Sequence, residues 1–171
     1  MKRLADGLTA SRALIAIAMV LLGFEGKKAL PAVVWLTILG WTTDILDGRF
    51  ARRAPEKKST WLGDHDFQFD MLMVFAILAY LALAGFVSMR LALIYTAIAA
   101  VAIAYFRSKS VTELFMFLIL TAQMAITYRE TPQMAYLYLL WIVVALLFNW
   151  RRFTDVVREF IENMKRLHHS A

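Results

Sequence analysis

Four aspartates form two pairs at spacings that place side chains on one face of a helix. Asp44 and Asp47 are three residues apart, and Asp66 and Asp70 are four apart. On two neighbouring antiparallel helices, such pairs can direct four carboxylates into one cavity. Four anions that close together need cations between them, and their hard oxygen atoms suit Mg²⁺, Mn²⁺ or Ca²⁺. The spacing therefore predicts a divalent-metal site.

The residues beside the first pair favour a phosphate-bearing ligand. Gly48 and Ala51 lack bulk, so a nucleotide could approach this helix closely. Arg49, Arg52 and Arg53 supply forked guanidinium donors that match phosphate oxygens. Mg²⁺ is commonly shared between one or two carboxylates and substrate phosphates. Together these residues indicate a site for a metal-bound pyrophosphate.

The aspartates must be positioned by membrane-spanning helices. The chain has 171 residues, of which 61% are hydrophobic, more than a soluble domain of this size could bury. Six apolar segments approach the roughly 17 to 25 residues that a spanning helix needs, and strand-like alternation is absent. They are Leu8 to Phe24, Ala29 to Leu46, Asp70 to Met89, Leu91 to Phe106, Val111 to Tyr128, and Met134 to Asn149. We expect an all-α polytopic membrane protein with one domain over residues 1–171.

The tail beyond the sixth segment has its own apolar pattern. Its apolar residues recur at helical spacing between charges, which favours an amphipathic helix on the membrane surface over a merely solvated tail. These residues are Phe153, Val156, Val157, Phe160, Ile161 and Met164.

Lysine and arginine are distributed unevenly between the ends of the apolar segments. The N-terminus, the second-to-third and fourth-to-fifth connectors and the tail hold most of them, whereas the opposite ends hold Lys27, Lys28, Arg90 and Arg129. Cytoplasmic loops of membrane proteins carry the excess of basic residues. We therefore expect both termini and the aspartates to face the cytosol at the cytoplasmic membrane.

The charge distribution and the absence of cysteine limit the classes of ligand that the protein could bind and the side chains that could bind a metal. The formal net charge is +6, but the basic residues lie at the ends of apolar segments, where anionic lipid headgroups or phosphorylated substrates are better partners than nucleic acid. The chain has no cysteine, so a metal site must use oxygen or imidazole ligands. Arg12, Arg107 and Lys109 could bind the phosphate of an anionic substrate, although the orientation bias alone would also place basic residues there.

The aspartate region resembles the CDP-alcohol phosphotransferase family, whose signature reads D-x2-D-G-x2-A-R-x8-G-x3-D-x3-D. The first half matches at every fixed position, with Asp44, Asp47, Gly48, Ala51 and Arg52. In the second half, ten residues separate Arg52 from Gly63 and two separate Gly63 from Asp66, whereas the spacing of Asp66 and Asp70 is kept. Asp64 is a rival for the third aspartate, but the residue four positions after it is Gln68 rather than an acid. The segment from Gly7 to Arg12 is also similar to the L-T-x-x-R motif that opens the family's first span.

The resemblance implies a phosphoryl-transfer mechanism. Asp44, Asp47 and Asp66 would bind two Mg²⁺ or Mn²⁺ ions that hold the donor's pyrophosphate, and Asp70 would act as general base on the acceptor alcohol. Gly48, Ala51, Arg52 and Gly63 would lie against the donor. The expected donor is CDP-diacylglycerol, the first candidate acceptor is glycerol 3-phosphate, and CMP is the leaving group. A homodimer is also implied.

Two alternatives from other functional classes remain. The altered spacing before Asp66 would suit a catalytically silent relative that binds a CDP-linked lipid. An acidic site inside a membrane protein would also suit a cation transporter, since ionisable residues within membrane helices mark ion pathways as well as enzyme sites. Release of CMP separates the enzyme from both alternatives.

Overall fold

The fold is a bundle of helices. The computed structural model describes residues 2–53, 66–150, 153–155, 157–158 and 160–162, and no strand occurs within these ranges. The elements are α1 (Lys2–Gly23), the 3-10 helix η1 (Gly26–Ala29), α2 (Leu30–Arg53), α4 (Asp66–Leu83), α5 (Met89–Phe106), α6 (Lys109–Glu130) and α7 (Pro132–Phe148). The expected all-α fold is confirmed.

The helix ends follow from local backbone chemistry. The third apolar segment was expected to continue to Met89, but α4 ends at Leu83 and a turn follows in which Gly85 has φ +77°, a conformation that glycine adopts without strain. Ser88 then caps α5, because its side chain accepts a hydrogen bond from the Leu91 N–H at 3.3 Å. Pro132 begins α7 at a position where its missing N–H is not needed.

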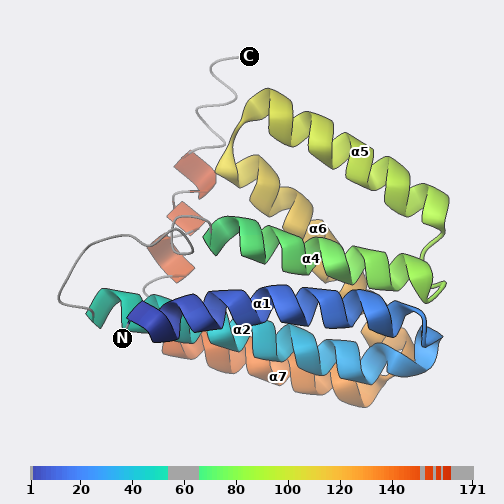
Figure 1. The fold of residues 1–171 in the computed structure, drawn as a ribbon, viewed down its shortest axis with the longest axis horizontal. Coiled ribbons are helices and arrows are strands. Elements are labelled where there is room, and N and C mark those ends of the chain that lie inside the picture. The colour runs from blue at the N-terminus through green and yellow to red at the C-terminus, as the bar shows by residue number, and fades with distance from the viewer. Residues whose placement is uncertain (1, 54–65, 151–152, 156, 159, 163–171) are drawn as a thin grey trace.

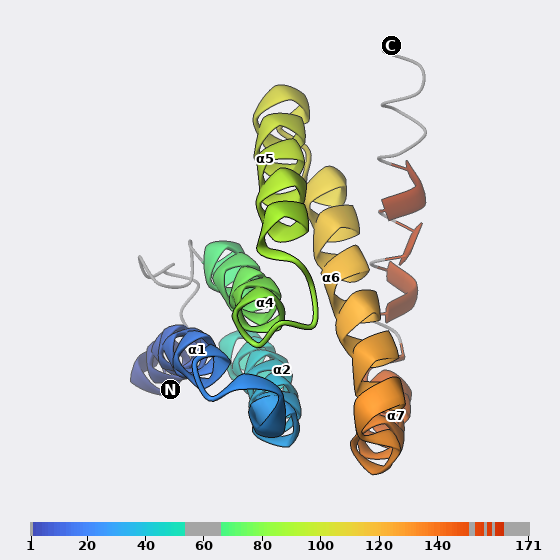
Figure 2. The ribbon, with the colours of Figure 1, turned by 90° about the vertical axis from the view of Figure 1, so that its right-hand side faces the viewer.

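The helices lie side by side along the long axis of the molecule, and successive helices alternate in direction (Figure 1). The start of α1, the end of α2, the start of α4 and the end of α7 therefore lie at one end of the bundle (Figure 1). Seen end-on, α4 lies among α1, α2, α5 and α6, whereas α5 and α7 lie on the outside (Figure 2). Helix α1 packs against both α2 and α4.

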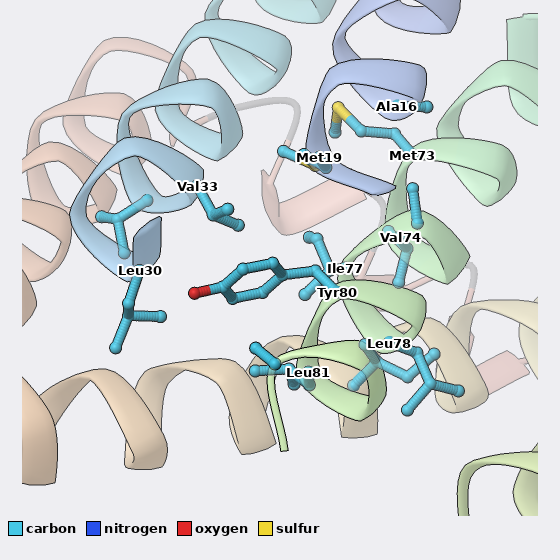
Figure 3. Close-up of a cluster of buried hydrophobic side chains, with 14 of the residues drawn as sticks. Ala16, Met19, Leu30, Val33, Met73, Val74, Ile77, Leu78, Tyr80 and Leu81 are labelled. Atoms are coloured by element: carbon cyan, nitrogen blue, oxygen red, sulfur yellow. The ribbon is translucent and has the colours of Figure 1, made fainter. Parts of the chain in front are cut away.

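The core lies between α1, α2 and α4 (Figure 3). Met19, Val33 and Ile77 are fully buried there, one from each of these helices. Tyr80 is also fully buried, and its hydroxyl donates a hydrogen bond to the Gly26 carbonyl at 3.3 Å, which ties α4 to the turn between α1 and α2. This packing fixes the three helices that carry the polar residues described below.

Two close approaches depend on glycine. A Cβ at Gly23 would lie 2.7 Å from the Leu83 Cβ, and a Cβ at Gly40 would overlap the Met73 sulfur. Met73 reaches from α4 to α2 one helical turn from Asp70, which it follows by three positions. The absence of a side chain at Gly40 therefore allows α4 to pack against α2 just below the aspartates.

The apolar helices suggest a membrane-embedded protein. Among the described residues, three helical segments are long and apolar enough to cross a bilayer: Gly26–Leu46, Met89–Phe106 and Lys109–Glu130. A fourth results if α7 is joined to the bent helical segment that follows it, and shorter apolar helices cover Ser11–Gly23 and Phe67–Leu83. Large apolar side chains of α5, such as Leu93, Ile98 and Val101, are mostly exposed, which suits contact with lipid.

Candidate active site

Three charged side chains from three helices meet at the end of the bundle where α4 begins. Arg12 on α1 donates from Nη1 to Asp44 Oδ1 on α2 at 3.4 Å, and the same nitrogen donates to Asp70 Oδ1 on α4. The Arg12 side chain is fully buried, while the two carboxylates keep 14% and 16% of their surfaces exposed. The aspartates are thus neighbours that face a partly accessible space, with the arginine behind them.

Local sequence explains how α2 presents Asp44. The helix runs without a break from Leu30 to Arg53, so the predicted helical spacing of Asp44 and Asp47 is present in the backbone. The hydroxyls of Thr42 and Thr43 donate to the carbonyls of Ile38 and Gly40, respectively, within the same helix. Their polar groups are satisfied locally, so they do not compete with Arg12 for the aspartate.

The remaining members of the predicted site are described only in part. Asp47, Gly48, Ala51 and Arg52 belong to the last turns of α2, and Asp66 is the first residue of α4. The positions of their side chains lie outside the described part of the structure. Gly63 and Asp64, the alternative candidate for the third aspartate, lie outside the described residues altogether. The structure therefore brings together Asp44 and Asp70, one from each predicted pair.

The described charges suit a cation ligand. Two carboxylates share one guanidinium, which leaves the trio with excess negative charge, and hard oxygen donors are the groups that Mg²⁺ and Mn²⁺ prefer. Within the described side chains, no group of three or more His, Cys, Asp or Glu could hold a metal ion. A complete ligand set would therefore need acids beyond Asp44 and Asp70, and Asp47 and Asp66 are the ones the sequence offers.

Lys109 and Arg107 flank this end of the bundle. The Lys109 ammonium lies 3.6 Å from Glu113 Oε1 and 5.9 Å from the ring centroid of Phe67, which directly follows Asp66. Arg107 is exposed, and it is the one non-glycine residue with positive φ, 46°, in the described ranges. This left-handed residue ends α5, and its backbone N–H donates to the Ile103 carbonyl at 2.9 Å. Arg107 thus directly follows α5, and Lys109 is the first residue of α6.

An apolar groove has Asp44 among its lining residues. It has a volume of about 700 Å³, lies between α2, α6 and α7, and includes Asp44 at its edge. Apolar side chains such as Ile45, Met124 and Tyr138 line most of it. Trp141 on its wall donates from Nε1 to the Thr42 hydroxyl at 3.1 Å, which fixes α7 against α2. The groove joins the charged end to the membrane-facing part of the bundle.

The burial of Arg12 was not expected from its sequence position. The sequence placed it among basic residues that could bind a substrate phosphate, but the structure places it beneath two aspartates. A signal was present: Ala16 and Met19 follow Arg12 by four and seven residues, and both are buried. Residues at these spacings share a helix face, so Arg12 belongs to the buried face of α1.

Comparison with known proteins adds a family assignment. A family model described as CDP-alcohol phosphatidyltransferase matches residues 2–164, nearly the whole chain. No curated protein and no solved structure matches the chain. The matched region includes every element that carries the trio and the groove.

Proposed function

Because the chain belongs to the CDP-alcohol phosphatidyltransferase family, we propose that it transfers the phosphatidyl group of CDP-diacylglycerol to a small alcohol in a metal-dependent reaction. Members of this family transfer a phosphatidyl group from a CDP-alcohol to an alcohol. The observation that carries the finer proposal is the meeting of Asp44 and Asp70 at one guanidinium, together with an apolar groove that Asp44 also lines. The charged diphosphate of the donor would bind at the aspartates, and its acyl chain would lie in the adjacent groove.

The four aspartates would have different roles in the reaction. Asp44, Asp47 and Asp66 would hold two Mg²⁺ or Mn²⁺ ions, and the donor's diphosphate would lie along the last turns of α2 beside Gly48, Ala51, Arg52 and Gly63. When bound, such ions stabilise both the attacking and the leaving oxygens of an in-line displacement. The excess negative charge of the described trio supports this assignment.

Asp70 would act as the general base. It takes the proton of the acceptor's hydroxyl, whose oxygen then forms a bond to the β-phosphorus of the donor. The bond from that phosphorus to the bridging oxygen breaks, and CMP leaves with the electron pair. Asp70 also contacts the Arg12 guanidinium, which helps to fix the position of its carboxylate. Positioning of the reactants would supply a further part of the rate.

The apolar groove supports a lipid donor rather than a water-soluble one. Its volume of about 700 Å³ falls within the range of ligand-sized clefts, and its lining suits a hydrocarbon chain. Because Asp44 lies at its edge, a donor with its diphosphate at the aspartates could place an acyl chain between α2, α6 and α7. A soluble CDP-alcohol would leave this surface unused.

The acceptor proposed first is glycerol 3-phosphate. Arg107, which directly follows α5, and Lys109, the first residue of α6, are both exposed at the aspartate end, where they could bind the acceptor's phosphate. Lys109 already lies near Phe67 at the start of α4, which supports a position beside the reacting groups.

The finer topology is part of the same proposal. We infer six membrane spans with both termini and the aspartates on the cytosolic side of the cytoplasmic membrane. A C-terminal amphipathic helix would lie on that surface, and two copies would form a homodimer. The common position of the α1 start, the α2 end and the α4 start at one end of the bundle supports a single cytosolic face (Figure 1).

The direct test is CMP release by the purified protein in lipid nanodiscs with CDP-diacylglycerol and a panel of alcohols. We expect turnover with Mg²⁺ or Mn²⁺, loss of turnover with a chelator, and a product whose mass is the phosphatidyl ester of the acceptor. Failure with every alcohol would favour a silent relative. Cation flux in proteoliposomes, without CMP release, would favour a transporter.

The groove can be tested separately. Ala145 lies on its lining, so Ala145→Phe should fill part of it and raise KM for a long-chain donor more than for a short-chain donor. Ala97→Phe is the matched control, since Ala97 is exposed on the outer helix α5. Equal effects of the two substitutions would argue against a donor chain in the groove.

A further inference from the structure

Arg12 is the most fully enclosed charged side chain of the trio. It is 0% exposed, and its Nη1 contacts carboxylates that belong to two different helices. A guanidinium cannot be deprotonated in proteins, so it stays charged in this apolar setting. A buried charge persists only where partners compensate it. Asp44 and Asp70 are thus among the partners that compensate the charge of Arg12.

The burial of Arg12 separates it from the substrate. Ala16 and Met19 continue the same face of α1 into the core, where both are buried. The aspartates keep a partly exposed surface whereas the arginine has none, so a ligand would meet the carboxylates first. A direct contact with the phosphate of an acceptor would require Arg12 to leave this position.

We propose that Arg12 is a positioning residue that holds Asp44 on α2 and Asp70 on α4 in the arrangement required for transfer. The inference rests on the proposed function for its kinetic consequences only. Helix α1 packs against both α2 and α4, so a side chain on α1 is placed to link the two helices. Without the guanidinium, two carboxylates of like charge would repel and separate.

The shape of the guanidinium is essential to this role. It presents several donors in a rigid plane, whereas a lysine ammonium is a compact point charge on a flexible stem. Arg12→Lys would retain the charge but lose the rigid link between the two acids. Arg12→Gln would lose both.

The first experiment compares kinetic parameters of Arg12→Lys and Arg12→Gln with those of Arg90→Lys and Arg90→Gln. Arg90 is exposed near the start of α5 and lies outside the proposed site. Misplacement of reacting groups by about 1 Å can lower a rate by about 100-fold, so we expect kcat of Arg12→Lys to fall at least about tenfold. We expect the KM for the acceptor to change less than about twofold. A large rise in acceptor KM with unchanged kcat would show direct substrate binding and overturn the proposal.

The second experiment measures the distance between α2 and α4 without any catalytic readout. The chain has no cysteine, so Leu46→Cys and Gln68→Cys, both at exposed positions, provide one unique pair for spin labels. These positions lie two residues after Asp44 and two before Asp70. We expect a narrow distance distribution in the otherwise native protein, a broader one with Arg12→Gln, and no change with Arg90→Gln.

The two experiments separate failure of the inference from failure of the proposed function. If Arg12→Gln does not yield monodisperse protein, Arg12→Lys carries the distance comparison. An unchanged distribution in the Arg12 variant that folds would overturn the positioning role. Absence of CMP release by the native protein would reject the proposed function, yet the distance measurement would still decide whether Arg12 positions the two helices.

Discussion

Two polar clusters inside the bundle differ in charge and in place. Arg12, Asp44 and Asp70 join α1, α2 and α4 at the end where α4 begins, and the two acids are partly accessible. Thr37 and Gln123 join α2 and α6, and both are fully buried. Gln123 Nε2 donates to the Thr37 hydroxyl at 2.9 Å, and that hydroxyl donates to the Val33 carbonyl at 2.8 Å.

The neutral cluster has the character of a helix contact. Side-chain hydrogen bonds between membrane helices contribute only about 0.6 kcal/mol on average. Gln123 Oε1 has no hydrogen-bond partner within the described residues, which reduces the net contribution of this side chain further. The charged cluster is too costly to assemble for packing alone, since buried ion pairs often stabilise no better than apolar residues. The difference is consistent with the catalytic role proposed for the charged cluster.

The largest effect should come from Asp70. Asp70→Asn removes the proposed base and should lower the rate of CMP release by about 10²- to 10⁴-fold, the contribution of general-base catalysis. Asp155→Asn is the control, since Asp155 is an exposed acid beyond α7. Activity of Asp70→Asn within tenfold of the native rate would remove Asp70 from the catalytic role.

A pair of leucine substitutions compares the two clusters directly. Arg12→Leu removes a buried guanidinium from two partly buried acids and should lower the free energy of unfolding by about 3–5 kcal/mol. Gln123→Leu removes a polar atom that lacks a partner within the described residues, and it should change the free energy of unfolding by less than about 1 kcal/mol. Unfolding of both variants can be measured by steric trapping in bicelles. Equal losses would contradict the distinction between the clusters.

The contact below the charged cluster can be tested at Gly40. Gly40→Ala places a methyl group against the Met73 sulfur and should cost about 1–3 kcal/mol of stability, as overpacking does. In a Met73→Ala background the same substitution should cost little, because the obstructing side chain is gone. Gly7→Ala is the control, since nothing lies within 4 Å of a Cβ there. A cost at Gly40 that persists without Met73 would contradict the contact.

The smallest effect should come from an ion pair at the opposite end of the bundle. Glu25 Oε2 lies 2.8 Å from Lys28 Nζ, and this hydrogen bond, with the attraction between the charges, holds the pKa of Glu25 below its ordinary value. A carboxyl group with a lowered folded-state pKa stabilises the protein above its unfolded pKa, about 4.3. That stabilisation is lost as pH falls through the folded pKa.

Glu25→Gln should therefore lower the melting temperature slightly at pH 7 and by less at pH 3. The pair is exposed, so the difference should be close to the limit of measurement. Glu130→Gln, at another exposed glutamate of the same end, is the control. A larger loss at pH 3 than at pH 7 would have the wrong sign for this explanation.

Much of this architecture can be read from local sequence patterns. Apolar runs of suitable length predicted the helices, although α7 begins at Pro132, two residues before the sixth apolar segment. The helix ends were less accurate: α1 already begins at Lys2 and α2 continues to Arg53, because charged residues are also compatible with helix beyond an apolar run. The early end of α4 at Leu83 depends on the turn at Gly85, which apolar composition does not reveal.

The candidate site was predictable as a set of acids but not as an arrangement. Helical spacing predicted that Asp44 and Asp70 could converge, and the structure places both against one guanidinium. That Arg12 would be their common partner depends on how α1 crosses α2 and α4, which is a property of tertiary packing. The groove beside Asp44 likewise depends on three helices that are distant in sequence.

The buried position of the Met73 side chain has a consequence for its oxidation. Its thioether is fully buried against Gly40, so peroxide cannot reach the sulfur while the two helices remain together. Conversion to the sulfoxide would add a polar oxygen to a contact that has no room for a methyl group. The rate at which Met73 is oxidised should therefore report how often the helices part just beneath the aspartates.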